Sequence, residues 1–271
     1  MNKLRNDKLA IIINADDFGY DLDSTLATIE CLEIGAIRSA SVMPNMPATQ
    51  LAVNFAKKNP QFSFGIHLTF SKDTQECSIS DPKLIKSICR RDGSFFKSNI
   101  VRSLALLKIL SVDQICIEMS SQIEKMLDEG LKISHIDSHG HLHKFKPFME
   151  ALKRVLPYYG ISKVRNIQNV YINKPYLSPT YWFGQHMSKR LKKSFLTTPY
   201  FFMSTCENDI ENITKVIDSY NGGLLEIGFH PGSINHRDVW RYKERLACLK
   251  LSEFCNNAGI QLINWNDIND F

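Results

Sequence analysis

Acidic and imidazole side chains recur in this 271-residue chain at the ends of short apolar runs. The segments concerned are residues 14–19, 65–69, 135–143 and 229–232. Carboxylates and neutral imidazoles together are a usual ligand set for a divalent metal ion, and both groups transfer protons near neutral pH. We therefore expect metal-assisted acid–base chemistry if the fold brings these segments together.

The densest cluster lies in residues 135–143, which hold four of the eight histidines. Its polar members at odd positions are His135, Asp137, His139, His141 and His143. An extended backbone would place them on one face of a strand, where burial is costly unless something binds them. A solvent-exposed cluster is the alternative, although Ile133 and Ile136 favour a partly buried strand.

Asp16 and Asp17 directly follow the first apolar run. Adjacent residues of a regular strand point to opposite faces, so both can serve one site only if the strand ends or bulges there. Gly19 is consistent with such an interruption. The alternative is that one of the two carboxylates caps the next helix.

His67 and His230 also come at the ends of apolar runs, and a lone histidine is more often a core or surface residue than a ligand. Their position changes this interpretation, because the carboxyl ends of parallel strands gather at the working face of a barrel. Pro231 and Gly232 predict a turn that would present His230 at the rim.

The elements that must position these residues alternate between short apolar runs and longer amphipathic segments. Strands are expected at residues 9–13, 39–43, 62–68, 135–138, 163–166, 199–203, 224–229 and 261–265. Helices are expected at residues 24–34, 50–58, 112–129, 147–156, 210–220 and 239–257. This rhythm predicts an α/β fold with a parallel sheet, and eight strands fit a (β/α) barrel of the TIM-barrel type.

The chain length and pattern predict a single (β/α)-barrel domain over residues 1–271, with loop insertions near residues 71–99 and 168–198. The second insertion carries aromatic residues: Tyr171, Tyr176, Tyr181, Trp182 and Phe183. They could stack on sugar rings or simply attach the loop to the barrel, and the sequence leaves both interpretations open.

Composition excludes several classes of function. A content of 44% hydrophobic and 23% charged residues is that of a globular protein, and the net charge of +5 is mild. The basic run at residues 189–193 is best interpreted as a solvated helix face, and no nucleic-acid-binding motif is present. The seven cysteines are scattered, and residues 1–8 are polar, so we expect a cytoplasmic protein. The chain has no long apolar run, which predicts that it does not span a membrane.

The four ordered segments resemble those of the carbohydrate deacetylases of the YdjC type, which include the chitooligosaccharide deacetylases and hopanoid-associated relatives. The resemblance implies a (β/α) barrel, often incomplete or distorted, that binds one divalent metal ion (Zn²⁺ or Mg²⁺). Carried over by motif, the metal ligands would be Asp17, His67 and His139. Asp16 would be the general base and His230 the general acid.

The resemblance also implies an N-acetylated sugar or oligosaccharide as the substrate, which would lose its acetyl group by hydrolysis of the amide. Arg165 would lie near the site and orient Asp16. Asp137, His141 and His143 would orient the ligands or line the pocket. Self-association of the chain is left open.

Two alternatives remain at this stage. One is another metal-dependent hydrolase on the same scaffold, acting on a phosphoester or on a non-sugar amide, since a fold alone permits this. The other is a non-catalytic module that binds a metal or a glycan. The presence of both a candidate base and a candidate acid disfavours a module that only binds.

Overall fold

The computed structural model describes residues 9–172, 177–205, 210–220 and 222–270. Three features of the sequence analysis lie outside these ranges: the polar segment 1–8, Tyr176 and one of the seven cysteines, Cys206. Within them, none of the helices is long and apolar enough to cross a membrane.

Seven parallel strands form one curled sheet in the described part of the chain. They are β1 (Leu9–Phe18), β2 (Ser39–Val42), β3 (Ser63–Leu68), β4 (Ile133–Ser138), β5 (Tyr200–Met203), β6 (Gly223–Phe229) and β7 (Gln261–Ile263). Their order is β4-β3-β2-β1-β6-β5, and β7 also pairs with β1. β1 is buried along its whole length, as its continuous apolar run predicts.

The expected strand at residues 163–166 is wrong. This segment forms one isolated bridge to β4, between Ile136 and Val164, and one bridge on its other side, between Lys163 and Leu196. Single bridges on either side are too few to make a ladder, so the sheet does not continue through this segment. The α/β prediction is confirmed in the form of a curled half-barrel, which corresponds to a distorted (β/α) barrel.

Eight helices lie between the described strands. They are α1 (Leu22–Glu33), α2 (Thr49–Lys58), α3 (Ser98–Leu106), α4 (Val112–Asp128), α5 (Lys146–Val155), α6 (Pro179–Leu191), α7 (Ile210–Asp218) and α8 (Val239–Asn257). Helices α3 and α6 were not expected, because each lies at or within a segment that was interpreted as a loop insertion. The other six agree with the expected helices to within a few residues.

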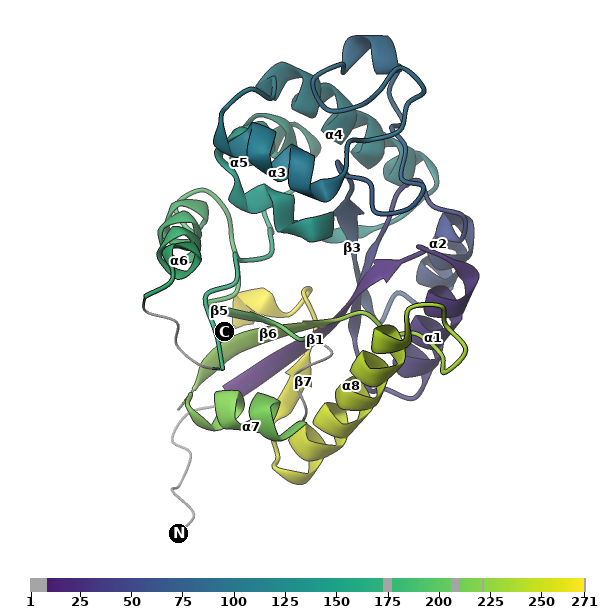
Figure 1. The fold of residues 1–271 in the computed structure, drawn as a ribbon. Helices are drawn as coiled ribbons and strands as arrows, with labels where there is room; N and C mark the ends of the chain where they lie inside the picture. The colour runs from purple at the N-terminus through teal and green to yellow at the C-terminus, as the bar shows by residue number, and fades with distance from the viewer. Residues whose placement is uncertain (1–8, 173–176, 206–209, 221, 271) are drawn as a thin grey trace.

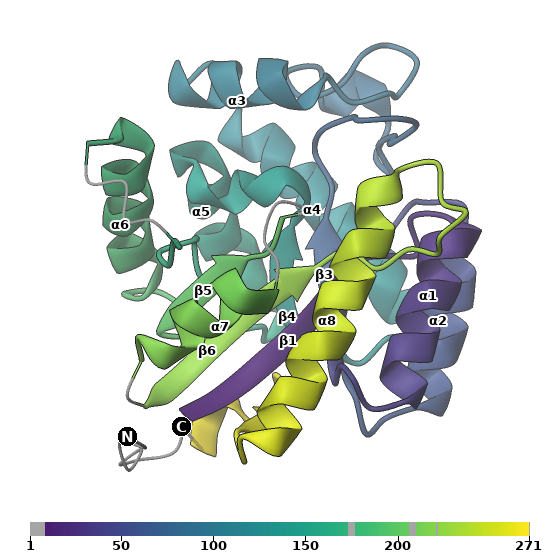
Figure 2. The ribbon, with the colours of Figure 1, turned by 60° about the horizontal axis from the view of Figure 1, so that its bottom comes forward.

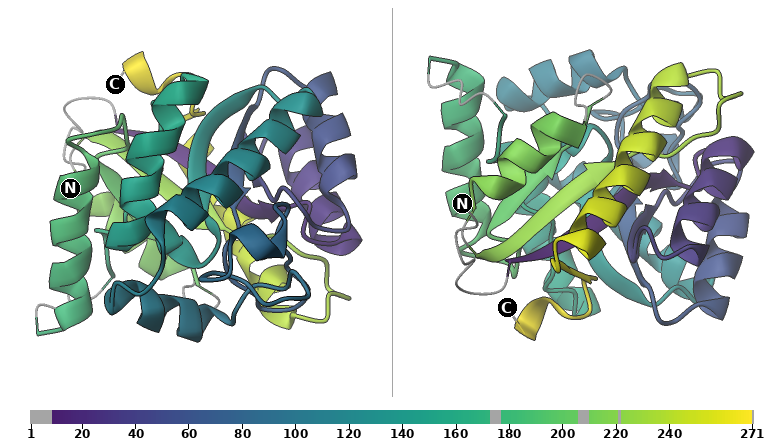
Figure 3. Two further views of the ribbon diagram at one scale, coloured as in Figure 1. Left: turned by 90° about the horizontal axis from the view of Figure 1, so that it is seen from above. Right: turned by 90° about the horizontal axis from the view of Figure 1, so that it is seen from below.

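The helices cover different parts of the sheet. Figure 1 shows α3, α4 and α5 at the top near β3, α1 and α2 to the right of the strands, and α8 below them next to α1. The rotated view in Figure 2 shows α7 and α8 in front of β6 and β1, and the view from below in Figure 3 agrees. The main apolar core fills the space between these helices and the sheet.

Residues 135–143 are not one extended strand, so the prediction that their odd-numbered side chains share a face is wrong. β4 ends at Ser138, and residues His139–Lys144 form a 3₁₀ segment in which Gly140 and His141 have positive φ. His135 is buried and stacks on Trp265 with ring centroids 4.5 Å apart. Burial lowers the pKa of His135 to about 3, so this imidazole is neutral.

Candidate metal centre and active site

The strand β1 is irregular at Asp16 and Asp17, near its carboxyl end. Its register with β2 shifts between Ala15 and Phe18, and Asp17 has a φ of 58°. This bulge lets adjacent residues serve one site, as the sequence analysis required. The N-cap of α1 is Asp21, so neither Asp16 nor Asp17 caps that helix.

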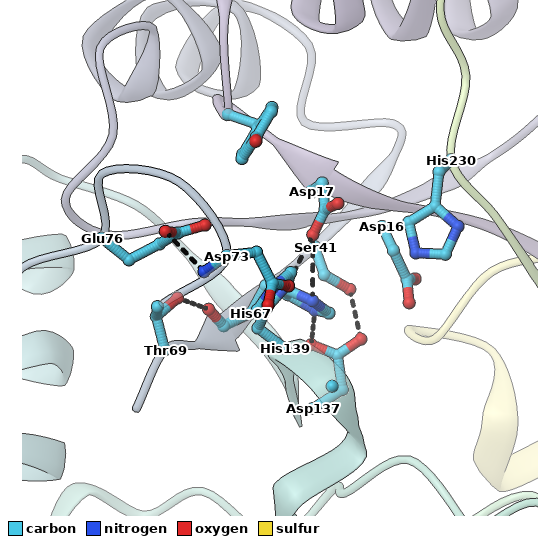
Figure 4. A network of polar contacts seen from close by, with 12 residues as sticks. Asp16, Asp17, Ser41, His67, Thr69, Asp73, Glu76, Asp137, His139 and His230 are labelled. Carbon is cyan, nitrogen blue, oxygen red and sulfur yellow. Dashed lines mark hydrogen bonds and ion pairs between the residues drawn. The ribbon is translucent and has the colours of Figure 1, made fainter. Parts of the chain in front are cut away.

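Asp17, His67 and His139 converge at the carboxyl ends of β1, β3 and β4 (Figure 4). Oδ1 of Asp17 lies 3.2 Å from Nε2 of His67 and 3.1 Å from Nδ1 of His139. One ligand atom from each of the three residues lies within 4.8 Å of the other two. Tetrahedral zinc ligands at about 2.1 Å from the ion lie about 3.4 Å apart, so this donor set fits a small divalent cation.

Each of the two histidines has a carboxylate on its other ring nitrogen. Asp137 Oδ1 lies 2.8 Å from His67 Nδ1, and Asp73 Oδ2 lies 2.7 Å from His139 Nε2. Metal-binding histidines usually have such a partner, which fixes the tautomer and the ring orientation. Burial opposes a positive charge here, yet Asp137 raises the pKa of His67 to about 9. Asp17 and Asp73 raise the pKa of His139 to about 10.

A second acidic group, Asp16, His67 and Asp137, is also compact enough to hold an ion. However, the guanidinium of Arg165 already forms ion pairs with both carboxylates of this group. Arg165 donates to both oxygens of Asp16 at 2.6 and 2.7 Å and lies 2.6 Å from Asp137 Oδ2. Its Nε donates to the buried Glu226 at 2.7 Å. Of the two groups, the one formed by Asp17, His67 and His139 is therefore the better candidate to hold a cation.

His230 follows the last residue of β6 and is held by α8. Glu244 Oε2 accepts a hydrogen bond from the His230 backbone N–H at 2.8 Å and lies 3.0 Å from Nδ1 of its ring. The Trp240 ring lies edge-on to the imidazole at 5.3 Å. Burial disfavours the imidazolium, but Glu244 raises the pKa of His230 above its usual value.

The other two predicted histidines are set apart from the three ligand atoms. His143 Nδ1 lies 2.7 Å from Ser138 Oγ, and His141 lies beside Phe201 with ring centroids 5.7 Å apart. Burial lowers the pKa of His143 to about 4 and that of His141 well below its usual range, so both rings are neutral. Of the residues expected to orient the ligands, Asp137 is the one whose contact with a ligand is direct.

A cavity of about 570 Å³ adjoins this edge of the sheet, and His141 is part of its wall. Aromatic and cationic side chains line it, among them Phe145, Tyr171, Phe183, Arg102 and Lys144. Arg102 donates to the backbone carbonyl of Gly140 at 3.1 Å, next to His139. Two of the aromatic residues from the second insertion, Tyr171 and Phe183, therefore line a cavity whose wall includes His141, two residues after the candidate ligand His139.

Sequence reasoning missed several residues that hold the site together: Asp73, Glu226, Arg241 and Glu244. Asp73 lies in the polar insertion after β3, where nothing in the spacing distinguishes it from its neighbours. Arg241 and Glu244 lie in α8, an amphipathic helix that was expected only to cover the sheet. The available signal was that Arg241 and Glu244 are charged residues on the side of this helix expected to face the sheet. A charge buried there needs a partner, which would have indicated a polar site.

The curled parallel sheet defines a barrel-like α/β class of protein, and the Asp-His-His set at its carboxyl edge could hold a metal ion. The profile of the family described as YdjC-like protein matches residues 10–252. Among the relatives, the carbohydrate deacetylase of Clostridium beijerinckii is 28% identical over 96% of this chain and 100% of its own length. The carbohydrate deacetylase of Halalkalibacterium halodurans is 32% identical over 91% of this chain and 94% of its own.

The chain therefore belongs to the YdjC-like family, to which it is matched over most of its length. A crystal structure from Enterococcus faecalis, described as a cellobiose-phosphate cleavage protein, superposes with a TM-score of 0.79 at 22% identity. It covers 97% of this chain and 99% of its own. At this identity the similarity supports the shared fold alone.

Proposed function

We propose that this protein is a carbohydrate deacetylase that hydrolyses the acetamide of an N-acetylated sugar with the help of one divalent cation, Zn²⁺ or Mg²⁺. The observation that carries the proposal is the convergence of Asp17, His67 and His139 within 4.8 Å at the carboxyl edge of the sheet. Asp16 and His230 lie at the same edge (Figure 4). The carbohydrate deacetylases among its relatives support the sugar as substrate.

Asp16 would act as the general base. A cation held by Asp17, His67 and His139 would polarise the acetyl carbonyl and acidify a water molecule, which together would make the amide susceptible to attack. The Asp16 carboxylate then takes a proton from the attacking water. Arg165 donates a hydrogen bond to each of its oxygens, and Asn14 Nδ2 donates to Oδ1 at 2.9 Å, so the base is held in one orientation.

His230 would act as the general acid. An amine is a poor leaving group until its nitrogen gains a proton, and an imidazolium provides one near neutral pH. Glu244 holds Nδ1 of His230, which leaves Nε2 as the nitrogen that faces a substrate. The acid and the base are therefore different residues with separate partners, Glu244 for His230 and Arg165 for Asp16.

Glu244→Gln is expected to move the alkaline limb of the kcat–pH profile to lower pH. Glu244 raises the pKa of His230, and the acid works only while protonated, so activity is present below this pKa and is lost as the pH rises through it. A neutral glutamine lowers that pKa. The measurement is kcat from pH 5 to 10, with Glu253→Gln, an exposed change in the same helix, as the control. An unmoved alkaline limb would contradict the role of Glu244.

The cavity beside the centre would receive the sugar. Phe183 and Tyr171 offer aromatic faces of the kind on which sugar rings stack, while Arg102 and Lys144 offer hydrogen-bond donors to hydroxyl groups. Under this proposal the second insertion has a binding role as well as an architectural one.

Removal of the metal is expected to abolish acetate release from N-acetylglucosamine mono-, di- and oligosaccharides. The protein is treated with a chelator, dialysed, and assayed for acetate before and after one equivalent of Zn²⁺ or Mg²⁺ is added. Restoration by a single equivalent supports one ion per chain. Undiminished release from protein that contains no metal would overturn the proposal.

The same assay separates the alternatives. A phosphoesterase usually uses two metal ions, so a content of two ions per chain together with phosphate release would favour that reaction. Binding of a glycan without turnover on any member of the panel would favour a non-catalytic module.

A further inference from the structure

The two oxygens of the Asp17 carboxylate have different partners. Oδ1 faces the two imidazoles, at 3.2 Å from His67 and 3.1 Å from His139. Oδ2 points the other way and accepts a hydrogen bond of 2.6 Å from Nη2 of Arg241. In the arrangement described, one oxygen is therefore directed to the metal centre and the other is held by a guanidinium.

Arg241 is itself held firmly in place. Its Cζ lies 4.8 Å from the centre of the Tyr20 ring and 4.7 Å from that of the Trp240 ring. Two aromatic contacts of this kind fix the plane of a guanidinium. The backbone at Gly232 also packs closely, because a Cβ there would lie 2.7 Å from Cβ of Arg241. The residue is 3% exposed, so it has little room to move away from Asp17.

We propose that Arg241 restricts Asp17 to a single coordinating oxygen and thereby keeps the coordination number of the bound cation low. This inference rests on the metal centre of the proposed function. A carboxylate free of this contact can offer both oxygens to one ion, as carboxylates often do to larger, oxygen-preferring cations. With Oδ2 engaged, the protein supplies three donor atoms, an arrangement that suits Zn²⁺ and leaves positions open for water and substrate.

The proposal predicts a change in metal preference when Arg241 is replaced. In Arg241→Met, Oδ2 becomes available, so the ratio of the Zn²⁺ to the Mn²⁺ dissociation constant is expected to shift by at least about tenfold toward Mn²⁺. The cobalt(II)-loaded variant is expected to lose visible absorption intensity, since this falls as the coordination number rises. Arg241→Lys keeps a cationic donor and is expected to stay closer to the wild type in both measurements.

Controls separate this role from a merely structural one. Lys250→Met makes the same change of charge at an exposed position of α8 and should leave both readouts unchanged. If Arg241→Met does not fold, Tyr20→Leu removes one of the two aromatic contacts and should shift the metal ratio in the same direction. The metal ratios are measured by competition with a chromogenic chelator and, for Mn²⁺, by electron paramagnetic resonance.

Two outcomes overturn the inference, and they differ. If the wild type binds one divalent ion but Arg241→Met, or Tyr20→Leu in its place, keeps the wild-type cobalt spectrum and metal ratio, Arg241 does not restrict Asp17 and the proposed function stands. If the wild type binds neither Zn²⁺, Mn²⁺ nor Co²⁺, the metal centre is absent and the proposed function fails as well.

Discussion

Asp17→Asn is expected to abolish both metal binding and acetate release. The change removes the one anionic group among the three proposed ligands and leaves the two histidines without the charge that draws a cation between them. Affinity for Zn²⁺ should fall by more than about a hundredfold, beyond the range typical of residues that only support ligands. The measurements are metal content after dialysis and acetate release from N-acetylated oligosaccharides.

The substitution is well matched to its position. Asp17 has a φ of 58°, and asparagine is among the few residues that adopt this region readily, whereas alanine would add strain. The fold should therefore survive, which a circular dichroism spectrum that matches that of Asp81→Asn, an exposed change, would verify. Retention of one tightly bound ion by folded Asp17→Asn would contradict the ligand assignment.

Much of the scaffold follows from local sequence. A continuous apolar run predicts β1 as a strand buried on both faces, and Asp16-Asp17 at its end with Gly19 after it predicts an interruption there. The structure has both, and Gly19 has a φ of 97° where a Cβ would approach Thr49 to 3.0 Å. The convergence of the three proposed ligands followed from one general rule, that the carboxyl ends of parallel strands share an edge.

Other parts depend on contacts that periodicity does not encode. The prediction that residues 135–143 form one extended strand is wrong because Gly140 and His141 have positive φ. The turn points His139 and His143 in directions that a continuous strand would not give them. Histidines at alternate positions occur whether the strand continues or turns, so their spacing alone could not predict where β4 ends. The expected strand at residues 163–166 is wrong because it makes single bridges on each side.

Helix α8 shows why the residues that hold the site together could not be predicted from the sequence. Arg241 binds Asp17 on β1, 224 positions earlier, and Glu244 binds His230 after β6. Both residues lie near the start of α8, one turn apart and on the face toward the sheet. Their partners are set by the packing of this helix over the edge of the sheet, so one helix positions both a proposed metal ligand and the proposed acid.

Asp16→Asn is expected to show the opposite pattern to Asp17→Asn, with the metal retained and turnover lost. The amide cannot accept a proton from water at neutral pH, so kcat should fall by about a hundredfold to ten-thousandfold. Arg165 keeps Asp137 and Glu226 as partners, and the bound ion keeps its three proposed ligands, so the centre should remain intact.

The comparison of metal content with kcat in the two variants tests whether Asp17 binds the metal while Asp16 acts as the base. Asp16→Asn that releases acetate at the wild-type rate would show that another group takes the proton from water. Asp16→Asn that loses the metal would show that the ion pair between Asp16 and Arg165, and not the bulge in β1 alone, keeps the proposed ligands in place. A metal-loaded but inactive Asp16→Asn is the result expected if the bulge gives two neighbouring residues separate tasks, because Asp16 faces Arg165 while Asp17 faces the two histidines.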